Sequence, residues 1–281
     1  MSTPRRAAVL GHPIGHSLSP RLHRAAYAAL GLDGWQYDAI DVTEEQLPGF
    51  VAELDDSWAG LSVTMPLKQT VMDLVDHVEP LASVVGAVNT VLVQGGGRRP
   101  TLVGANTDVY GIVSALREGA GARGIPAEPS GVVLGAGATA SSTLAALAEL
   151  GCTHPVVYVR SLGRTGVLAR AAHRMGVEPT FRPIAEAPAA LPSADLVVST
   201  LPPGAADPLA ELSGPVSGLL LDVAYDPRRS ALGTAWQRAG GVTVDGERML
   251  LHQACEQVRL MTGQPAPLAA MNAALDEALT A

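Results

Sequence analysis

Apolar and polar positions in the first part of the chain alternate in short stretches that predict strands and helices in turn. The expected strands are Ala7 to Leu10, Gln36 to Asp41 and Gly60 to Val63, and the expected helices are Ser19 to Leu30 and Glu44 to Leu54. Strands that alternate with helices pair in parallel within an α/β fold. We therefore predict an α/β domain at the start of the chain.

Start and stop signals support the helix expected at Ser19. Ser19 is a capping residue type, and Pro20 suits the first helical position because its missing N–H would be unpaired there anyway. The apolar positions that follow recur at helical spacing and are Leu22, Ala25, Ala26 and Ala29. Two further strands, Val88 to Val93 and Thr101 to Val103, are joined by the glycine-rich stretch Gln94 to Pro100, which predicts a mobile hairpin loop.

A second unit is predicted to begin near Asn106. Its helix Asp108 to Glu118 leads into a Gly/Pro-rich linker, Gly119 to Ser130, whose composition marks a domain boundary. The elements that follow are Val132 to Leu134, a helix to Leu150, Val156 to Val159, the helix Gly166 to Met175, Leu196 to Ser199, Leu219 to Ala224 and Val242 to Val244. This order is typical of a doubly wound sheet. Helices Arg248 to Met261 and Leu268 to Leu279 are expected last.

Composition narrows the function classes. The 281 residues allow two domains of ordinary size, and the net charge of -8 argues against a nucleic-acid binder, which needs a basic face. Two cysteines outside any metal-ligand spacing give no support to a disulfide framework or a metal site, and apolar stretches too short to span a bilayer predict no membrane segment. A cytoplasmic protein is expected.

Lys68 is the single lysine among 19 basic side chains. A compositional bias towards arginine explains the scarcity of lysine elsewhere. The one ammonium group that remains then indicates a position that needs a titrating group, which arginine cannot provide. Both interpretations can hold together.

The most specific motif follows the strand Val132 to Leu134. Gly135 permits a tight turn, Gly137 lets a pyrophosphate approach the backbone, and Ala140 allows the next helix to pack closely on the sheet. The alternative is a purely structural glycine turn. The predicted cofactor-binding residues of this motif are Gly135, Ala136, Gly137, Ala138, Thr139 and Ala140.

The end of the next strand indicates which dinucleotide is bound. NAD enzymes place a carboxylate there, whereas this chain has Arg160 and Ser161, with Arg164 four residues after Arg160. Guanidinium groups suit a phosphate monoester. We therefore predict NADP, with ordinary surface arginines as the alternative.

Polar groups near the ends of the first domain's strands predict a site for a small polar ligand. Ser17 and Ser19 can bind a carboxylate or polyol, although Ser19 can equally be a helix cap. Further polar groups follow other strands and are Thr64, Lys68, Asn89 and Asp108. Lys68 and Asp108 make the natural acid/base pair, and together these residues predict an NADP oxidoreductase.

Six motifs in this order resemble the shikimate dehydrogenase family over nearly the whole chain: GHPIGHSLSPRLH, SVTMPLK, GAVNT, GANTD, LGAGATA and MLLHQA. The resemblance implies an NADP-dependent enzyme of aromatic amino-acid biosynthesis that interconverts 3-dehydroshikimate and shikimate. It also implies a substrate domain over residues 1–107 that helices 248–281 complete, a Rossmann domain over residues 108–247, and a cleft between them.

Site residues follow from the resemblance position by position. Lys68 and Asp108 would be catalytic, and Ser17 and Ser19 would bind the substrate carboxylate, with Tyr225 nearby. The ring hydroxyls would face Thr64, Asn89, Asp108 and Gln253. On the cofactor side, Gly246 and Met249 would lie at the nicotinamide end, and Thr200 is included among the cofactor-binding residues.

Departures from the family pattern keep alternatives open. Ser62 stands where the family usually has asparagine, Val159-Arg160-Ser161 replaces an NRT-like motif, and Glu247-Arg248 replaces small residues. A quinate/shikimate or aminoshikimate-type dehydrogenase is the alternative enzyme, and a non-catalytic NADP-sensing regulatory module is the alternative from another class. Monomer and homodimer are both open, and no metal, nucleic acid or membrane is expected as a partner.

Overall fold

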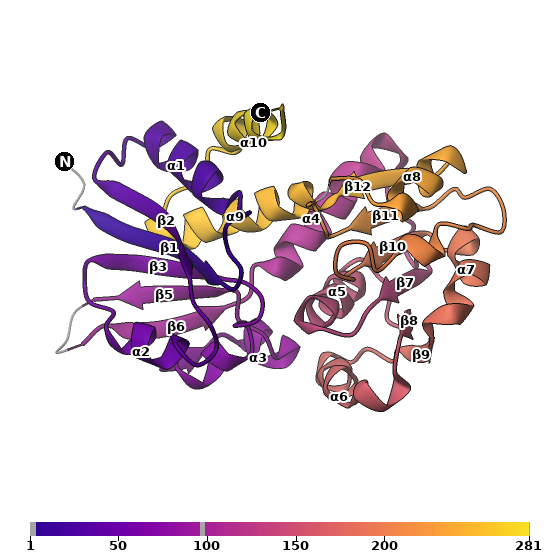
Figure 1. Ribbon diagram of the computed structural model, residues 1–281, viewed down its shortest axis with the longest axis horizontal. Helices are drawn as coiled ribbons and strands as arrows, with labels where there is room; N and C mark the ends of the chain where they lie inside the picture. The colour runs from indigo at the N-terminus through magenta and orange to yellow at the C-terminus, as the bar shows by residue number, and fades with distance from the viewer. Residues whose placement is uncertain (1–3, 96–98, 227, 281) are drawn as a thin grey trace. The chain divides into compact units, whose positions relative to one another are not determined.

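The computed structural model describes residues 4–95, 99–226 and 228–280 and divides into two compact units (Figure 1). One unit joins Met1–Thr107 with Gln253–Ala281, and the other is Asp108–His252. Each unit is built on its own six-stranded sheet. Residues 96–98 of the expected hairpin loop lie outside the described residues.

The sheet of the first unit is mixed and has the strand order β2-β1-β3-β5-β6-β4. Its strands are β1 (Arg5–Gly11), β2 (Trp35–Asp41), β3 (Trp58–Val63), β4 (His77–Val78), β5 (Thr90–Gln94) and β6 (Thr101–Ala105). β1 pairs in parallel with β2 and β3, as the alternation of strands and helices predicts. β5 pairs antiparallel with both β3 and β6, so the predicted hairpin is confirmed.

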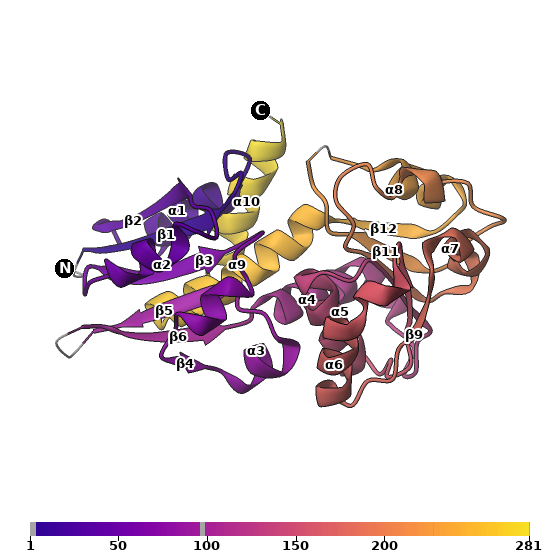
Figure 2. The same ribbon diagram turned by 60° about the horizontal axis from the view of Figure 1, so that its bottom comes forward.

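Helices complete the first unit. They are α1 (Ser19–Ala29), α2 (Leu47–Ala52), α3 (Pro80–Val85), α9 (Gly246–Thr262) and α10 (Leu268–Thr280), with a 3-10 turn over Thr70–Asp73. α1 packs against α10, which joins the two ends of the chain in one unit (Figure 2). α9 begins in the second unit and crosses into the first at residue 253.

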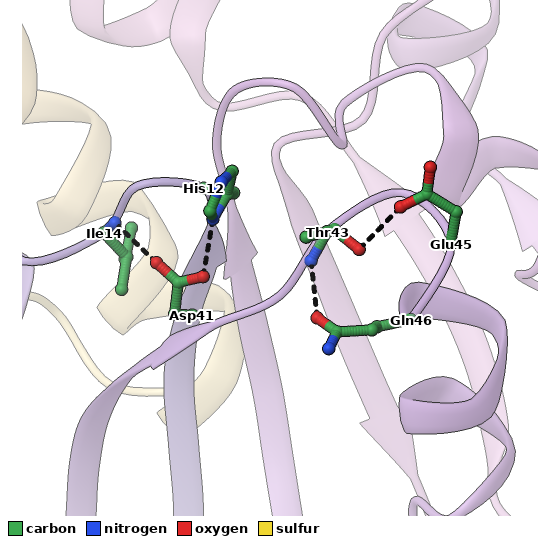
Figure 3. A network of polar contacts seen from close by, with 6 residues as sticks. All are labelled: His12, Ile14, Asp41, Thr43, Glu45 and Gln46. Carbon is green, nitrogen blue, oxygen red and sulfur yellow. Dashed lines mark hydrogen bonds and ion pairs between the residues drawn. The ribbon is translucent and has the colours of Figure 1, made fainter.

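Two local predictions at helix starts are corrected. Leu18, in place of Ser19, is the N-cap residue of α1, and no side chain caps the helix; Ser19 is already helical and buried. The second helix begins at Leu47 instead of Glu44. The Gln46 side chain accepts the Thr43 N–H at 3.0 Å and the Thr43 hydroxyl donates to Glu45, which caps the preceding turn (Figure 3). Pro48 has no N–H to donate to the Glu44 carbonyl, so the helical bonds continue only from the Phe50 N–H to the Gln46 carbonyl at 3.1 Å.

The second unit has an all-parallel sheet in the order β12-β11-β10-β7-β8-β9. Its strands are β7 (Gly131–Leu134), β8 (Val156–Val159), β9 (Thr180–Pro183), β10 (Leu196–Ser199), β11 (Leu219–Asp222) and β12 (Val242–Asp245). This is the predicted doubly wound order, which reverses direction between β7 and β10. Ligands of such sheets bind where the order reverses, at the carboxyl ends of the strands.

Helices cover both faces of this sheet (Figure 2). They are α4 (Asp108–Ala120), α5 (Ala138–Glu149), α6 (Gly166–Met175), α7 (Ala187–Ala190) and α8 (Ala231–Arg238), with short 3-10 turns at Gly121–Arg123, Leu162–Arg164, Ile184–Glu186, Leu191–Ser193 and Asp207–Leu209. β9, α7 and α8 have no counterpart in the sequence prediction. The fully buried Trp236 of α8 donates its ring N–H to the Gly218 carbonyl at 3.0 Å, which ties α8 to the segment before β11.

Both cysteines are buried, and they are not joined in a disulfide. Within the described residues, no helix is long and apolar enough to cross a membrane. The same part of the chain holds no group of three or more His, Cys, Asp or Glu side chains that could ligate a metal ion.

Candidate functional site

The loop between β1 and α1 carries Ser17 and Ser19. Its first part is anchored to Asp41 at the end of β2 (Figure 3). Asp41 binds His12 Nδ1 through Oδ1 at 2.6 Å and accepts the Ile14 N–H through Oδ2 at 3.2 Å. The hydrogen bond from His12 holds the pKa of Asp41 below its usual range. The position of this loop is therefore set from a neighbouring strand.

Ser17 and Ser19 lie close together at the start of α1. The Ser17 hydroxyl accepts the backbone N–H of Ser19 at 3.3 Å, and Ser19 is buried while Ser17 is half-buried. The capping alternative for Ser19 is excluded by the N-cap at Leu18, and its role towards a carboxylate stays a prediction.

Close packing brings the start of this loop to the end of β3. A Cβ on Gly11 would lie 2.4 Å from the Thr64 methyl group and 2.9 Å from the Met65 carbonyl, so glycine is required there. Beyond Thr64, the backbone turns through a Leu67 N–H bond to the Thr64 carbonyl at 2.9 Å and reaches the half-buried Lys68. The Lys68 carbonyl accepts the Val88 N–H at 2.9 Å, which places Lys68 beside the segment that precedes Asn89.

Asn89, Thr107 and Gln253 meet in one buried cluster. The Asn89 amide donates to the Thr107 hydroxyl at 2.9 Å and to Gln253 Oε1 at 3.1 Å, and its Oδ1 accepts the Thr107 N–H at 2.7 Å. All three side chains are at most 7% exposed. Asn89 and Gln253, predicted from separate motifs, thus lie in direct contact, and the buried Asp108 follows Thr107 as the first residue of α4.

Sequence reasoning missed a second buried polar group beside this cluster. His23 is fully buried, stacks on Tyr37 at a ring separation of 3.9 Å and binds Gln257 at 3.3 Å. Ser62 accepts the Tyr37 hydroxyl at 2.5 Å and donates to Gln257 Oε1 at 2.8 Å. The available signal was the spacing of Gln253 and Gln257, which places two amides one turn apart on a single helix.

His23 predicts a pH-dependent stability. Burial lowers its pKa from 6.5 to about 3, so the unfolded chain binds a proton between these values that the folded chain does not. Neutral His23 therefore contributes fully to the free energy of unfolding above pH 6.5. As pH falls, protonation of the unfolded chain lowers the free energy of unfolding, by about 2 kcal/mol at pH 5. We expect His23→Gln to flatten the dependence of the unfolding free energy on pH between 7 and 5, measured by urea titration. The exposed His173→Gln should keep the wild-type slope, and a wild-type slope in His23→Gln as well would contradict this assignment.

The turn between β7 and α5 forms an open cradle. Gly135 has φ of 112°, and a Cβ there would lie 2.5 Å from the Thr200 hydroxyl, whereas a Cβ on Gly137 would meet no atom within 4 Å. α5 begins at Ala138, and Ala140 is fully buried against the sheet. Thr200 is held by its hydroxyl bond to the Leu134 carbonyl at 2.9 Å. The space above Gly137 and the free N–H groups of the first turn of α5 fit a pyrophosphate.

Arg160, Ser161 and Arg164 follow β8 directly and are exposed. The Arg164 N–H donates to the Ser161 carbonyl at 3.2 Å, which closes a turn directly after Arg160. Among the described residues, neither guanidinium group has an ion-pair or hydrogen-bond partner, and no carboxylate is paired with them. The arrangement fits the extra phosphate of NADP.

Tyr225, Gly246 and Met249 follow the ends of β11 and β12. A Cβ on Gly246 would lie 2.3 Å from the Val223 carbonyl, so glycine allows these two strand ends to approach. Met249 is buried, and burial raises the pKa of Tyr225.

The Glu247-Arg248 departure has partners within the second unit. The carboxylate of Glu247, 1% exposed, accepts Arg228 Nε at 2.7 Å. Arg248 pairs with Glu118 at 2.7 Å, and His252 binds the same carboxylate at 2.6 Å. Glu247 and Arg248, which replace small residues of the family pattern, therefore each form an ion pair within the second unit.

The all-parallel sheet, the open glycine turn and the arginines beyond β8 define a dinucleotide-binding α/β protein. Its other unit carries the buried polar cluster around Asn89. A family model described as the shikimate dehydrogenase substrate binding domain matches residues 9–91, and one described as the shikimate 5'-dehydrogenase C-terminal domain matches residues 246–275. A shikimate dehydrogenase (NADP(+)) of Rubrobacter xylanophilus is 37% identical over 98% of this chain and 99% of its own. The chain belongs to the shikimate dehydrogenase family.

Solved structures give the same grouping. The shikimate 5-dehydrogenase of Thermus thermophilus in complex with NADP(H) and shikimate is 34% identical and superposes with a TM-score of 0.82, covering 98% of this chain and 99% of that one. A quinate dehydrogenase of Corynebacterium glutamicum in complex with NAD is 27% identical with a TM-score of 0.83 over 98% and 99%. The fold alone therefore does not separate the shikimate enzyme from the quinate enzyme.

Proposed function

We propose that this member of the family is an NADP-dependent dehydrogenase that interconverts 3-dehydroshikimate and shikimate. The observation that carries the proposal is the open glycine turn before α5, with Arg160 at the end of the adjacent strand β8. The family relationship supplies the substrate class, and the arginine supports NADP over NAD. Residues 1–107 with the C-terminal helices bind the substrate, and the unit built on the parallel sheet binds the cofactor.

Residues of the second unit hold the cofactor. The backbone of the turn and the start of α5 hold the pyrophosphate, and Arg160 and Arg164 hold the extra phosphate. Thr200 supports the turn, and Gly246 and Met249 lie at the nicotinamide end. When bound, the reduced nicotinamide supplies a hydride to the ring ketone.

The remaining chemistry belongs to the side chains of the substrate unit and to Asp108. Lys68 donates a proton to the ring oxygen as negative charge develops on it, and Asp108 orients the lysine and a substrate hydroxyl. Ser17 and Ser19 donate to the carboxylate with Tyr225 nearby. Thr64, Asn89 and Gln253 bind the ring hydroxyls, so an analogue that lacks a hydroxyl leaves buried partners unpaired.

The experiment that tests this function is the reduction of 3-dehydroshikimate with NADPH, followed by nicotinamide absorbance, with shikimate identified as the product. Formation of shikimate in step with NADPH consumption is the expected result. Failure of the purified chain to consume NADPH would overturn the proposal and would favour the non-catalytic NADP-sensing module.

The quinate and aminoshikimate alternatives differ from this proposal in the substrate alone or in substrate and cofactor together. Ser19 and Arg160 favour the shikimate and NADP assignment over the quinate alternative. The cytoplasmic location stays a prediction, and monomer and homodimer both stay open.

A further inference from the structure

The side-chain amide of Gln257 uses all four of its hydrogen-bonding positions inside the first unit. Its Oε1 accepts from the Ser62 hydroxyl at 2.8 Å and from His23 Nε2 at 3.3 Å. Its Nε2 donates to the Thr90 hydroxyl at 3.0 Å and to the Asn89 carbonyl at 3.2 Å. Gln257 is 1% exposed, so water does not compete for these bonds. One side chain of α9 therefore joins α1, β3 and the start of β5.

These bonds have a fixed direction on the side of Asn89. Because the Thr90 oxygen accepts from Gln257, its single proton is free to be donated to Asn89 Oδ1 at 2.9 Å. The same Oδ1 accepts the Thr107 N–H at 2.7 Å. The Asn89 amide must then turn its Nδ2 towards Gln253 Oε1, which it meets at 3.1 Å. The Thr107 N–H and the Thr90 hydroxyl thus both hold Asn89 Oδ1 as the acceptor, and the Nδ2 donor in turn makes Gln253 Oε1 an acceptor. We call the hydrogen bonds that run from Gln257 through Thr90 and Asn89 to Gln253 the relay.

The bonds on the other side of Gln257 run in the same direction. The Tyr37 hydroxyl donates to Ser62 at 2.5 Å, which leaves the Ser62 proton for Gln257. Burial lowers the pKa of His23 to about 3, so its ring is neutral at neutral pH and carries one proton. That proton lies on Nε2 if Nδ1 accepts the Tyr27 hydroxyl at 3.4 Å. Every donor in this group then faces an acceptor.

We propose that Gln257, held by Ser62, is a positioning residue of the substrate site that, together with the Thr107 N–H, sets the donor and acceptor directions of the Asn89 and Gln253 amides. The inference rests on the proposed function, which places Asn89 and Gln253 against the ring hydroxyls. Gln257 has no contact with substrate in this account and acts through Thr90 and Asn89. Ser62 also gains a role, because its hydroxyl donates to Gln257 Oε1 and holds that amide in one orientation.

Recognition of the substrate hydroxyls should depend on Gln257, because Gln257 acts on Asn89 and Gln253 through the relay. An amide that turns over presents a donor where the hydroxyl needs an acceptor, and a buried unmatched pair is costly. Loss of the relay should weaken shikimate binding more than it weakens binding of a deoxy analogue, which lacks the hydroxyl. Cofactor binding, which belongs to the other unit, should not change.

The test compares Gln257→Met, which keeps the side-chain length but removes all four bonds, with Val258→Ala. Val258 is the next residue of α9, is fully buried and is apolar, so Val258→Ala perturbs packing without touching the relay. For the full-length protein we expect Gln257→Met to raise KM for shikimate on the order of tenfold, with KM for NADP+ unchanged. The preference for shikimate over a deoxy analogue in kcat/KM should fall by a similar factor, and Val258→Ala should keep the wild-type preference.

Ser62→Ala provides a milder second variant and closes a double-mutant cycle. If both residues act through one relay, the double variant loses no more preference than Gln257→Met alone. A wild-type preference in Gln257→Met, an equal loss in Val258→Ala, or additive losses in the cycle would each overturn the inference while the proposed function stands. Absence of shikimate turnover by the wild-type protein would instead overturn the proposed function and the inference with it.

Discussion

Replacing Lys68 with alanine is expected to lower kcat for 3-dehydroshikimate reduction on the order of 10²-fold or more. The alkoxide that develops at the ring oxygen would lose its positioned proton donor. The fold should persist, because Lys68 is only half-buried and the bond from Val88 to residue 68 uses the backbone carbonyl, which the substitution keeps. Steady-state kinetics at saturating NADPH, with thermal unfolding measured in parallel, check this.

Gln69→Ala is the matched control for this variant. Gln69 is the next residue, is exposed, and has no side-chain partner among the described residues. It should keep the wild-type kcat. An unchanged kcat in Lys68→Ala would remove the lysine from the mechanism, and an equal loss in both variants would indicate a structural disturbance of the turn after β3.

Replacing Arg160 with alanine is expected to raise KM for NADPH by about 10- to 100-fold and to leave KM for NADH nearly unchanged. NADPH carries one phosphate more than NADH, and the exposed guanidinium group after β8 is placed to bind it. Arg164 lies in the turn that directly follows Arg160, so Arg164→Ala should change the ratio in the same direction. The ratio of the two KM values, measured with 3-dehydroshikimate saturating, is the quantity to determine.

Arg21→Ala controls for the loss of a positive charge. Arg21 is exposed on α1 in the other unit and has no side-chain partner among the described residues. This variant should keep the wild-type ratio of the two KM values. Equal effects of Arg160→Ala on NADPH and NADH would mean that Arg160 does not recognise the extra phosphate.

The parallel sheet was predictable because each of its signals lies within a short stretch of sequence. Each strand is a short apolar run, and the glycine turn at Gly135 requires a strand before it and a helix after it. The edge strand β9 and helix α8 were missed. The start of α2 was misplaced as well, because Pro48 has no N–H to donate to the Glu44 carbonyl.

Only the site residues that lie within recognisable motifs could be predicted. Asn89 and Gln253 come from separate motifs and do meet in the structure. The relay through Gln257 was not predictable, because its contacts to Ser62 and His23 join residues 195 and 234 positions apart. The sequence alone indicates only that Ser62 lacks the family's amide, whereas the structure shows that Ser62 is buried on β3 and bonded to the Gln257 amide of helix α9. The acid/base roles of Lys68 and Asp108 stay predictions.

Oxidation of shikimate with NADP+ distinguishes this enzyme from its quinate-using relatives. The decisive quantity is kcat/KM at neutral pH for shikimate and quinate, each paired with NADP+ and NAD+. We expect activity largely confined to the pair of shikimate and NADP+. Comparable efficiency with quinate or with NAD+ would contradict it and would assign the chain to the quinate/shikimate alternative.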